Sequence, residues 1–202
     1  MTIEIWPEVA RRVAYAGRIF TIRQDRRRSP GTGREHGFDV LEASDWVNVV
    51  ALTGAGRVLL IRQYRAGTDE ITTEIPGGTV DGGETPRQAA ERELEEETGY
   101  RSSDWTLIGR VEPNPAFQTN TTWTFLARNA APASAQHFDE TEVIEVEERP
   151  LDEIPGLIAG GTIKHALVVC AFFHLAARGL LSLPPPPGVD GPAPVAESRT
   201  RT

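Results

Sequence analysis

Residues 78–100 read GTVDGGETPRQAAERELEEETGY, and this stretch predicts a glycine-rich loop followed by one well-bounded helix. Thr85 is a good N-cap, Pro86 suits the first helical position, and Gln88 completes a capping box with Thr85. Gly99 supplies the residue that ends the helix, because glycine adopts the left-handed conformation at little cost. The sequence therefore predicts a helix between Thr85 and Gly99.

The charges of this helix are placed unfavourably for its own stability. Acidic side chains are favourable in the first turn of a helix, whereas here four glutamates crowd the last half. Three of them, Glu93, Glu96 and Glu97, share one face, and each like-charged pair three or four residues apart costs roughly 0.2–0.5 kcal/mol. Local rules broken in this way tend to mark functional sites. The pattern fits either a solvated acidic face or a carboxylate cluster for a hard cation, Mg²⁺ or Mn²⁺ rather than zinc.

The composition is that of an ordinary globular protein. The chain has 202 residues, of which 39% are apolar and 25% charged, and this length fits one domain with extensions. It contains no run near the ~18–20 consecutive apolar residues that a membrane span needs, and residues 1–6 lack the pattern of a secretory signal. The single cysteine, Cys170, lies in an apolar run, so we expect a core residue and a cytoplasmic protein.

The net charge of −8 bears on the choice of partner. Proteins that bind nucleic acid usually carry a basic surface. The one dense basic cluster here, at residues 26–28, fits the solvated end of a hairpin beside residues 29–33. We therefore expect no nucleic-acid partner and no membrane partner. An acidic protein that handles phosphates must bind them locally, through a metal ion or a few arginines.

The order of the predicted elements indicates an α/β (α+β) fold. From residue 12 to 66 the pattern is mostly β, and a loop at 76–83 leads into the helix described above. The remaining predicted elements are β segments at 105–111, 121–127 and 143–147, a short helix at 151–159 and a longer apolar helix at 162–180. Strands that outnumber helices, with one helix between strands, favour a mixed sheet flanked by helices.

The spacing of residues 78–100 resembles the Nudix box, the signature loop–helix–loop of the Nudix hydrolases. From Gly78 there are five residues to Glu84, seven to Arg92-Glu93-Leu94, one to Glu96-Glu97 and one to Gly99-Tyr100. Every charged and glycine position of the motif is present, and only Tyr100 stands where an aliphatic residue is usual. The resemblance implies a Nudix-type α/β/α sandwich with a mixed sheet and a metal-dependent hydrolase of diphosphate bonds.

The resemblance also implies a role for each matched position. The metal ligands that it implies are Glu93, Glu97, Glu96 and the backbone carbonyl of Gly77. Arg92 would orient these glutamates, and Glu84 would support the loop–helix geometry. The chemistry agrees, because Mg²⁺ ions, or Mn²⁺ as a substitute, neutralise the diphosphate and lower the pKa of a bound water.

Segments on either side of the box resemble those of ADP-ribose and related nucleotide-sugar pyrophosphatases. Upstream, this resemblance implies that Arg65 meets a phosphate and that Glu74 lies close to the substrate or the metal; a surface position is the alternative for Arg65. Downstream, Pro115 falls 15 residues after the box, a mark of the ADP-ribose pyrophosphatases. The loop at 113–120 departs from that sub-family because it carries amides, including Gln118, instead of an acid, so another nucleotide sugar stays open.

The resemblance places the general base outside the box, in a loop before a late strand. Residues 138–146 resemble that segment, and Glu142 and Glu140 are the candidates, with Glu142 preferred. A general base must reach a metal-bound water within one hydrogen bond. The alternative is that both acids lie on the solvent side of a strand start.

Three further residues have competing interpretations. Trp46 fits either a base pocket or the core, and we favour the core. His165 and His174 lie nine residues apart in the last predicted helix and do not share a face well. We therefore expect both histidines to be structural or exposed rather than metal ligands.

Together these patterns predict Mg²⁺-dependent hydrolysis of a nucleoside diphosphate sugar, first of all ADP-ribose to AMP and ribose 5-phosphate. The alternatives are another nucleotide sugar or dinucleotide (GDP-mannose, NADH or a dinucleoside polyphosphate) and a non-catalytic, nucleotide-sensing Nudix domain, which the complete set of box glutamates disfavours. By resemblance we expect a homodimer. The predicted organisation is a β-rich N-terminal extension for dimerisation (1–45), a Nudix hydrolase domain (46–182) and a disordered Pro/Gly-rich tail (183–202).

Overall fold

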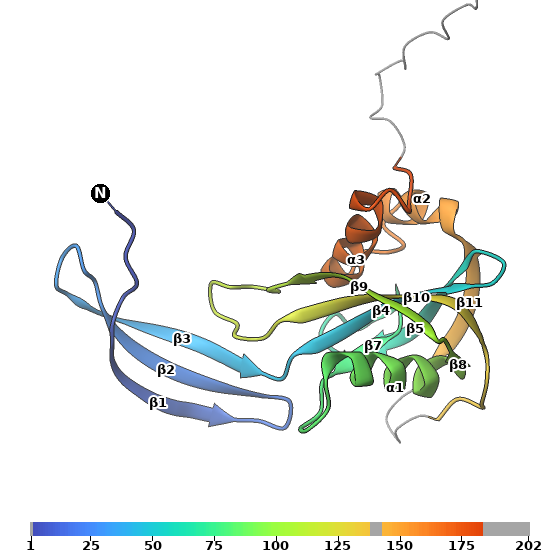
Figure 1. Cartoon of the computed structure of the whole chain (residues 1–202). Helices are drawn as coiled ribbons and strands as arrows, with labels where there is room; N and C mark the ends of the chain where they lie inside the picture. The colour runs from blue at the N-terminus through green and yellow to red at the C-terminus, as the bar shows by residue number, and fades with distance from the viewer. Residues whose placement is uncertain (1, 138–142, 184–202) are drawn as a thin grey trace, which may run out of the picture.

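The chain forms two β-sheets, of which the smaller projects to one side of the larger (Figure 1). This computed structural model describes residues 2–137 and 143–183. The strands are β1 (Glu8–Ala16), β2 (Phe20–Arg28), β3 (Glu35–Ala43), β4 (Trp46–Thr53), β5 (Arg57–Arg65), β6 (Glu70–Glu74), β7 (Gly77–Thr79), β8 (Tyr100–Arg101), β9 (Asp104–Val111), β10 (Thr122–Pro132) and β11 (Glu145–Pro150). The helices are α1 (Pro86–Thr98), the short 3-10 helix η1 (Leu151–Glu153), α2 (Ile154–Ala159) and α3 (Ala166–Ala177).

The smaller sheet consists of β1, β2 and β3 in antiparallel order. Its one buried charge, Asp25, pairs with Arg23 at 3.0 Å and with Arg27 at 3.0 Å. At the far end of the β2–β3 hairpin, Arg28 pairs with Glu35 at 2.9 Å. The basic cluster at residues 26–28 is therefore balanced by acids of its own sheet, as the hairpin interpretation predicts.

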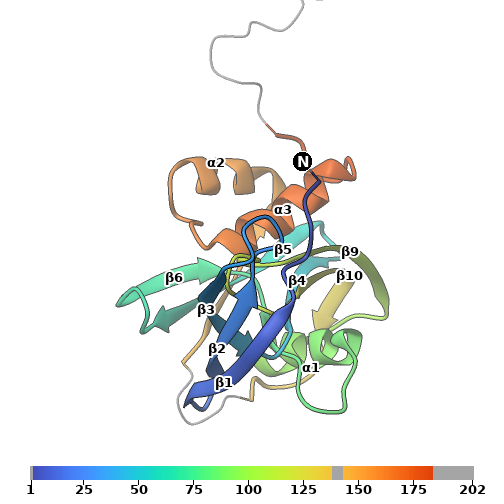
Figure 2. The ribbon, with the colours of Figure 1, turned by 90° about the vertical axis from the view of Figure 1, so that its left-hand side faces the viewer.

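The larger sheet is mixed. Strand β4 lies at its centre, antiparallel to β5 and β7 and parallel to β10. A parallel pair needs a crossover connection, and here the chain between β4 and β10 contains α1. Helix α1 covers one face of the sheet, and α2 and α3 cover the other, as Figures 1 and 2 show. The predicted mixed sheet between helices is confirmed.

Alternation along β4 explains the two layers of core. Val47, Val49 and Ala51 pack in the cluster that contains Leu94 of α1, whereas Val50 packs in the cluster that contains α3. Successive strand side chains point to opposite faces, so a strand covered on both sides is mostly apolar, and the buried Asn48 of β4 donates a hydrogen bond to the carbonyl of Leu167. Among the described residues, no helix is long and apolar enough to cross a membrane.

Helix α1 begins and ends as predicted. Thr85 is extended, its hydroxyl accepts a hydrogen bond from the Gln88 backbone at 3.3 Å, and the Gln88 side chain accepts one from the Thr85 backbone at 2.8 Å. Gly99 has a φ of 74° and donates its N–H to the carbonyl of Glu95 at 2.7 Å. The helix is bounded by contacts within its own sequence.

Two predictions about elements were wrong. The segment at 76–83, predicted as a loop, contains strand β7, which pairs with β4. The last helix spans Ala166–Ala177 instead of 162–180, because Gly161 has a φ of 75° and His165 is extended. His165 therefore precedes the helix, and this changes the direction of its side chain.

Candidate active site

Two consecutive glycines allow α1 to approach the centre of the sheet. Gly77 pairs with Asn48 of β4 and Gly78 pairs with Val47. A Cβ atom on Gly77 would collide with the backbone carbonyl of Val47, and one on Gly78 would collide with the carboxylate of Glu93. Glycine is therefore required at position 77, where the clash is with backbone, whereas a side chain at position 78 would displace the carboxylate of Glu93.

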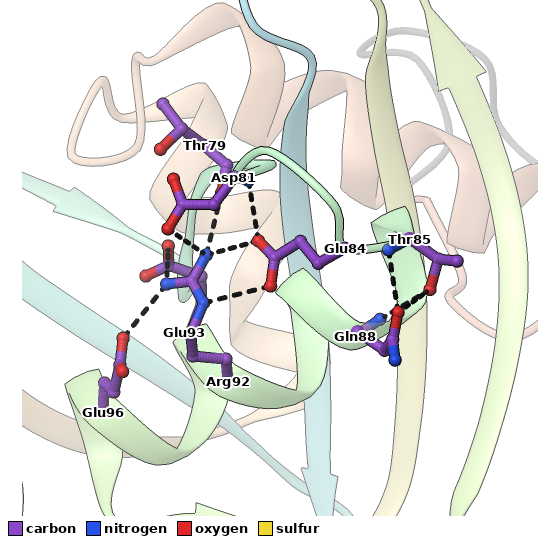
Figure 3. Close-up of polar contacts among 8 residues, drawn as sticks. All are labelled: Thr79, Asp81, Glu84, Thr85, Gln88, Arg92, Glu93 and Glu96. Carbon is purple, nitrogen blue, oxygen red and sulfur yellow. Dashed lines mark hydrogen bonds and ion pairs between the residues drawn. The ribbon is translucent and has the colours of Figure 1, made fainter.

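Arg92 is the centre of the charge network on α1 (Figure 3). Its Nη1 donates to Glu93 at 2.7 Å and to Glu96 at 3.1 Å, while its Nη2 donates to Glu84 at 2.8 Å and to the carbonyl of Thr79 at 3.0 Å. The hydrogen bond with Glu84 is the largest influence on both partners: it raises the pKa of Arg92 and lowers that of the Glu84 carboxyl. A planar guanidinium with five donors can hold several carboxylates in a fixed arrangement.

Glu97 joins the end of α1 to the preceding loop. Its side chain accepts a hydrogen bond from the backbone N–H of Gly77 at 2.8 Å, and the residue is 4% exposed. Glu93 is mostly buried and Glu96 is more exposed. Glu93 and Glu97 both lie against β7, and Glu96 shares their face of the helix. Their role as metal ligands stays a prediction.

The donor atoms of this cluster suit a hard divalent cation. Every side chain that the sequence assigned to the metal offers carboxylate oxygen, and oxygen is what Mg²⁺ and Mn²⁺ prefer. In residues 2–137 and 143–183, no three Asp, Glu, His or Cys side chains converge on one point; instead Arg92 joins Glu93 to Glu96. The residues present fit the cation by chemistry, and Glu93, Glu96 and Glu97 are the ones that would hold it.

A cleft of about 760 Å³ opens beside this cluster. Its walls come from β4, from the β5–β6 hairpin, from β7 and from the residues that enter α3. Gly77 and Gly78 line one part of it, and Arg65 and Glu74 line another. Trp46 is half-buried and also lines the cleft, so the prediction of a core position for this side chain was wrong.

Glu74 is the most strongly bound acid in the cleft. Arg65 donates two hydrogen bonds to it, at 2.9 and 2.8 Å, Thr72 donates one at 2.6 Å, and Nδ1 of His165 lies 3.0 Å away. Burial of this side chain, which is 4% exposed, by itself raises its pKa. The hydrogen bonds from Arg65, His165 and Thr72 outweigh burial and hold the pKa of Glu74 far below its ordinary value.

The other predicted site residues fall outside this arrangement. Pro115 and Gln118 lie between β9 and β10, where Gln118 bridges to Leu41 at the end of β3. Neither is among the described residues that line the cleft. Glu140 and Glu142 lie outside the described residues. Their assigned roles stay predictions.

Sequence reasoning missed His165 as a residue of the cleft. The histidine was expected to be structural or exposed rather than a metal ligand; its side chain is 39% exposed, and it contacts Glu74, which lies 91 residues away in the chain. The signal that could have found it is its position immediately before an apolar helix, where an extended residue directs its side chain away from the helix axis. His174 packs over Gly109 of β9.

Comparison with known proteins gives the family. The model of the NUDIX domain matches residues 45–172. The chain belongs to the Nudix family. The ADP-ribose pyrophosphatase of Bacillus subtilis (strain 168) is 27% identical over 174 residues, which cover 86% of this chain and 94% of that protein.

Two further relatives extend this result to the length of the fold. The ADP-ribose pyrophosphatase of Mycobacterium tuberculosis (strain ATCC 25618 / H37Rv) is 29% identical over 170 residues, which cover 81% of this chain and 79% of that protein. A solved structure described as an ADP compounds hydrolase superposes with a TM-score of 0.78 and 23% identity, covering 89% of this chain and 99% of that one. The Nudix fold of this chain is therefore established.

Membership of the Nudix family confirms the family predicted from residues 78–100 and the prediction of an enzyme of the pyrophosphatase class. Nudix hydrolases generally use divalent metal ions. Among the residues that match the box, Arg92 donates hydrogen bonds to Glu93 and Glu96. Glu97 accepts one from the backbone of Gly77.

Proposed function

We propose that this Nudix enzyme hydrolyses the diphosphate bond of a nucleoside diphosphate sugar, with ADP-ribose, cleaved to AMP and ribose 5-phosphate, as the first candidate. One observation carries the proposal: a cleft large enough for a nucleotide is lined both by Gly77 and Gly78, which lie against Glu97 and Glu93 of α1, and by the pair of Arg65 and Glu74. The relatives named ADP-ribose pyrophosphatase support this choice of substrate.

We propose Mg²⁺, with Mn²⁺ as a substitute, as the cation, held by Glu93, Glu96, Glu97 and the carbonyl of Gly77. When bound, it supplies neutralisation of the diphosphate charge and a lowered pKa for the attacking water. Arg92 keeps the carboxylates of Glu93 and Glu96 in place through its Nη1 donors. The positions of these ligands are therefore set before substrate arrives, which removes part of the ordering cost from the reaction.

Arg65 is proposed to contact a phosphate. Its guanidinium is held by two hydrogen bonds from Nε and Nη2 to the carboxylate of Glu74, and its side chain is nearly half-exposed in the cleft. A guanidinium fixed in this manner presents positive charge in one orientation. Pro115 and Gln118 remain candidates for substrate contact from the loop between β9 and β10, and Glu142, then Glu140, for the general base that takes a proton from water.

The β1–β3 sheet is proposed to join two copies of the chain, as the dimerisation extension of residues 1–45. Val13 is 61% exposed and Tyr15 is 59% exposed, and Phe20 and Phe38 of the same sheet and Ile19 of the β1–β2 turn are exposed as well. A projecting three-stranded sheet with apolar side chains in water is costly unless a partner covers it. We therefore propose a homodimer. We also propose that the protein is cytoplasmic.

Product analysis tests the proposed activity. Purified protein with Mg²⁺ is incubated with ADP-ribose, GDP-mannose, UDP-glucose, NADH and a diadenosine polyphosphate, and the products are separated by chromatography. We expect AMP and ribose 5-phosphate from ADP-ribose at the highest kcat/KM. If none of these compounds is turned over, the proposed hydrolase activity is contradicted. A preference for a dinucleotide would contradict the proposed sugar-nucleotide substrate.

A matched pair of variants controls for contaminating enzymes. Glu97→Gln removes a proposed metal ligand, whereas Glu91→Gln changes an exposed acid of the same helix that pairs with Arg87 at 2.7 Å. We expect the first variant to lose at least about a hundredfold in kcat, because a bound cation contributes several kcal/mol to such reactions. The second variant is expected to keep wild-type activity. Equal activity of the two variants would exclude Glu97 from the metal site.

A further inference from the structure

His165 stands at the junction between the cleft and α3. It is the residue before the helix, its backbone is extended, and its side chain makes no capping bond to the helix. The imidazole lines the cleft and is 39% exposed, with Nδ1 lying 3.0 Å from Oε2 of Glu74. This position gives the ring one buried edge and one accessible edge.

The hydrogen bonds to Glu74 decide which nitrogen of His165 carries the proton. Oε1 of Glu74 accepts from Nε of Arg65 and from the hydroxyl of Thr72, and Oε2 accepts from Nη2 of Arg65. An ionised carboxylate only accepts, so Nδ1 of His165 must donate to Oε2. In the neutral imidazole, Nε2 is then the acceptor. Among the described residues, the ring has no second hydrogen-bond partner.

The charges around His165 balance in pairs. Apart from the histidine, the cleft is lined by two cations and two anions: Arg65 pairs with Glu74, and Lys164 pairs with Glu70. Arg65 is the cation proposed to contact the diphosphate, and Lys164 pairs with Glu70, so the described lining of the cleft offers no excess positive charge for an additional phosphate group. An uncharged group with hydroxyls fits this end of the cleft better, because a hydroxyl can donate to the unpaired nitrogen of the imidazole.

We propose that His165 is a specificity-determining residue, whose Nε2 accepts a hydrogen bond from a hydroxyl of the uncharged sugar attached to the nucleoside diphosphate. This inference rests on the proposed function and adds to it the class of group that the cleft selects. The diphosphate lies toward Gly77 and the α1 carboxylates, and the sugar extends toward the start of α3. Glu74 acts through His165, because its carboxylate fixes the tautomer and the orientation of the ring.

Two substitutions separate the two edges of the ring. The amide of Asn reaches the place of Nδ1, so His165→Asn keeps the contact with Glu74 and removes the group at Nε2. The longer amide of Gln reaches the place of Nε2, so His165→Gln keeps the group that faces the cleft and removes the contact with Glu74. The substrates are ADP-glucose and the pentyl ester of ADP, which has no hydroxyl beyond the diphosphate.

We expect His165→Asn to lower kcat/KM for ADP-glucose about tenfold, mainly through KM, which is the magnitude for one neutral hydrogen bond. The same variant should leave kcat/KM for the pentyl ester unchanged. His165→Gln should retain most of the activity on ADP-glucose. If His165 had only a structural role, the substitution would reduce kcat/KM for both substrates together and would lower the melting temperature. Equal losses on the two substrates, or no loss on either, would overturn the inference.

Wild-type protein supplies a second test that does not depend on the folding of a variant. Among ADP-glucose analogues that each lack one sugar hydroxyl, one is expected to lose about tenfold in kcat/KM, and this loss should be absent in His165→Asn. Uniform rates across the analogues would overturn the role of His165 and leave the proposed function intact. The proposed function itself would be contradicted if the wild-type protein cleaved none of the three compounds: ADP-ribose, ADP-glucose and the pentyl ester.

Discussion

Glu97 accepts a hydrogen bond from the backbone N–H of Gly77, 2.8 Å away and 20 residues earlier in the chain. This bond joins the last turn of α1 to the strand that pairs with β4. Both residues are proposed as metal ligands, one through its carboxylate and the other through its carbonyl. The geometry of the site therefore depends on a bond between a helix and a sheet.

The bond between Glu97 and Gly77 predicts different outcomes for two substitutions. Glu97→Gln keeps an amide oxygen that can accept from Gly77, so we expect near wild-type stability with strongly reduced kcat. Glu97→Ala removes the acceptor from a part-buried N–H and should cost about 1 kcal/mol of unfolding free energy in addition. Urea titration and steady-state kinetics measure the two effects. Equal stability of the two variants would contradict the structural role of this bond.

The collision that a side chain at Gly78 would make with Glu93 predicts a loss of activity in Gly78→Ala. The carboxylate is the end of a flexible side chain and can move aside, so we expect little change in the unfolding free energy but weaker Mg²⁺ dependence of the rate. Gly82→Ala is the matched control in the same loop, because a Cβ atom at Gly82 meets open space. A Gly78→Ala variant as active as Gly82→Ala would show that activity does not need the close approach of the Glu93 carboxylate to the backbone of Gly78.

The lowered pKa of Glu74 predicts a pH-dependent contribution to stability. Because the folded-state pKa lies below the unfolded value of about 4.3, the unfolded chain takes up the proton first as the pH falls. The stabilisation is therefore complete above about pH 5 and is lost progressively below it. We expect the difference in unfolding free energy between wild type and Glu74→Gln to be largest near pH 7 and to shrink below pH 4. A difference that does not change from pH 7 to pH 3 would contradict the pKa assignment.

Removal of the metal tests the cofactor independently of any substitution. Dialysis against EDTA should abolish turnover of ADP-ribose, and Mg²⁺ should restore it, with Mn²⁺ as a weaker or equal substitute. Calorimetry of Mg²⁺ binding to wild type and to Glu93→Gln then assigns the ligand. Full activity after exhaustive chelation would exclude a divalent cation from the reaction.

The exposed apolar side chains of the β1–β3 sheet predict a change of oligomeric state in Val13→Asp. A charge at the centre of a covered apolar surface is costly to desolvate, so we expect dimers to dissociate at micromolar concentration. Ile71→Asp is the control, since Ile71 is 64% exposed on β6 of the larger sheet. Light scattering after gel filtration measures the mass. A wild-type monomer, or equal dissociation of both variants, would contradict the proposed interface.

Local sequence determined the helix and the residue types of the site. The capping box, the proline and the glycine of α1 act within a few residues of one another, so their outcome does not depend on the rest of the fold. The spacing of Glu93, Glu96 and Glu97 follows from the helical repeat alone. These features and the β-rich pattern of the remaining chain predicted a mixed sheet flanked by helices, and the resemblance of residues 78–100 to the Nudix box predicted the Nudix fold.

Tertiary structure alone decided the walls of the cleft. Asn48 donates to the carbonyl of Leu167 across 119 residues, and His165 meets Glu74 across 91 residues. Such contacts depend on the register of β4, β5 and β6 and on where α3 begins, and none of these is set by neighbouring residues. The strand pairing of Gly77 and Gly78 was hidden for the same reason, because glycine has no strand preference of its own and pairs here only because β4 lies beside it.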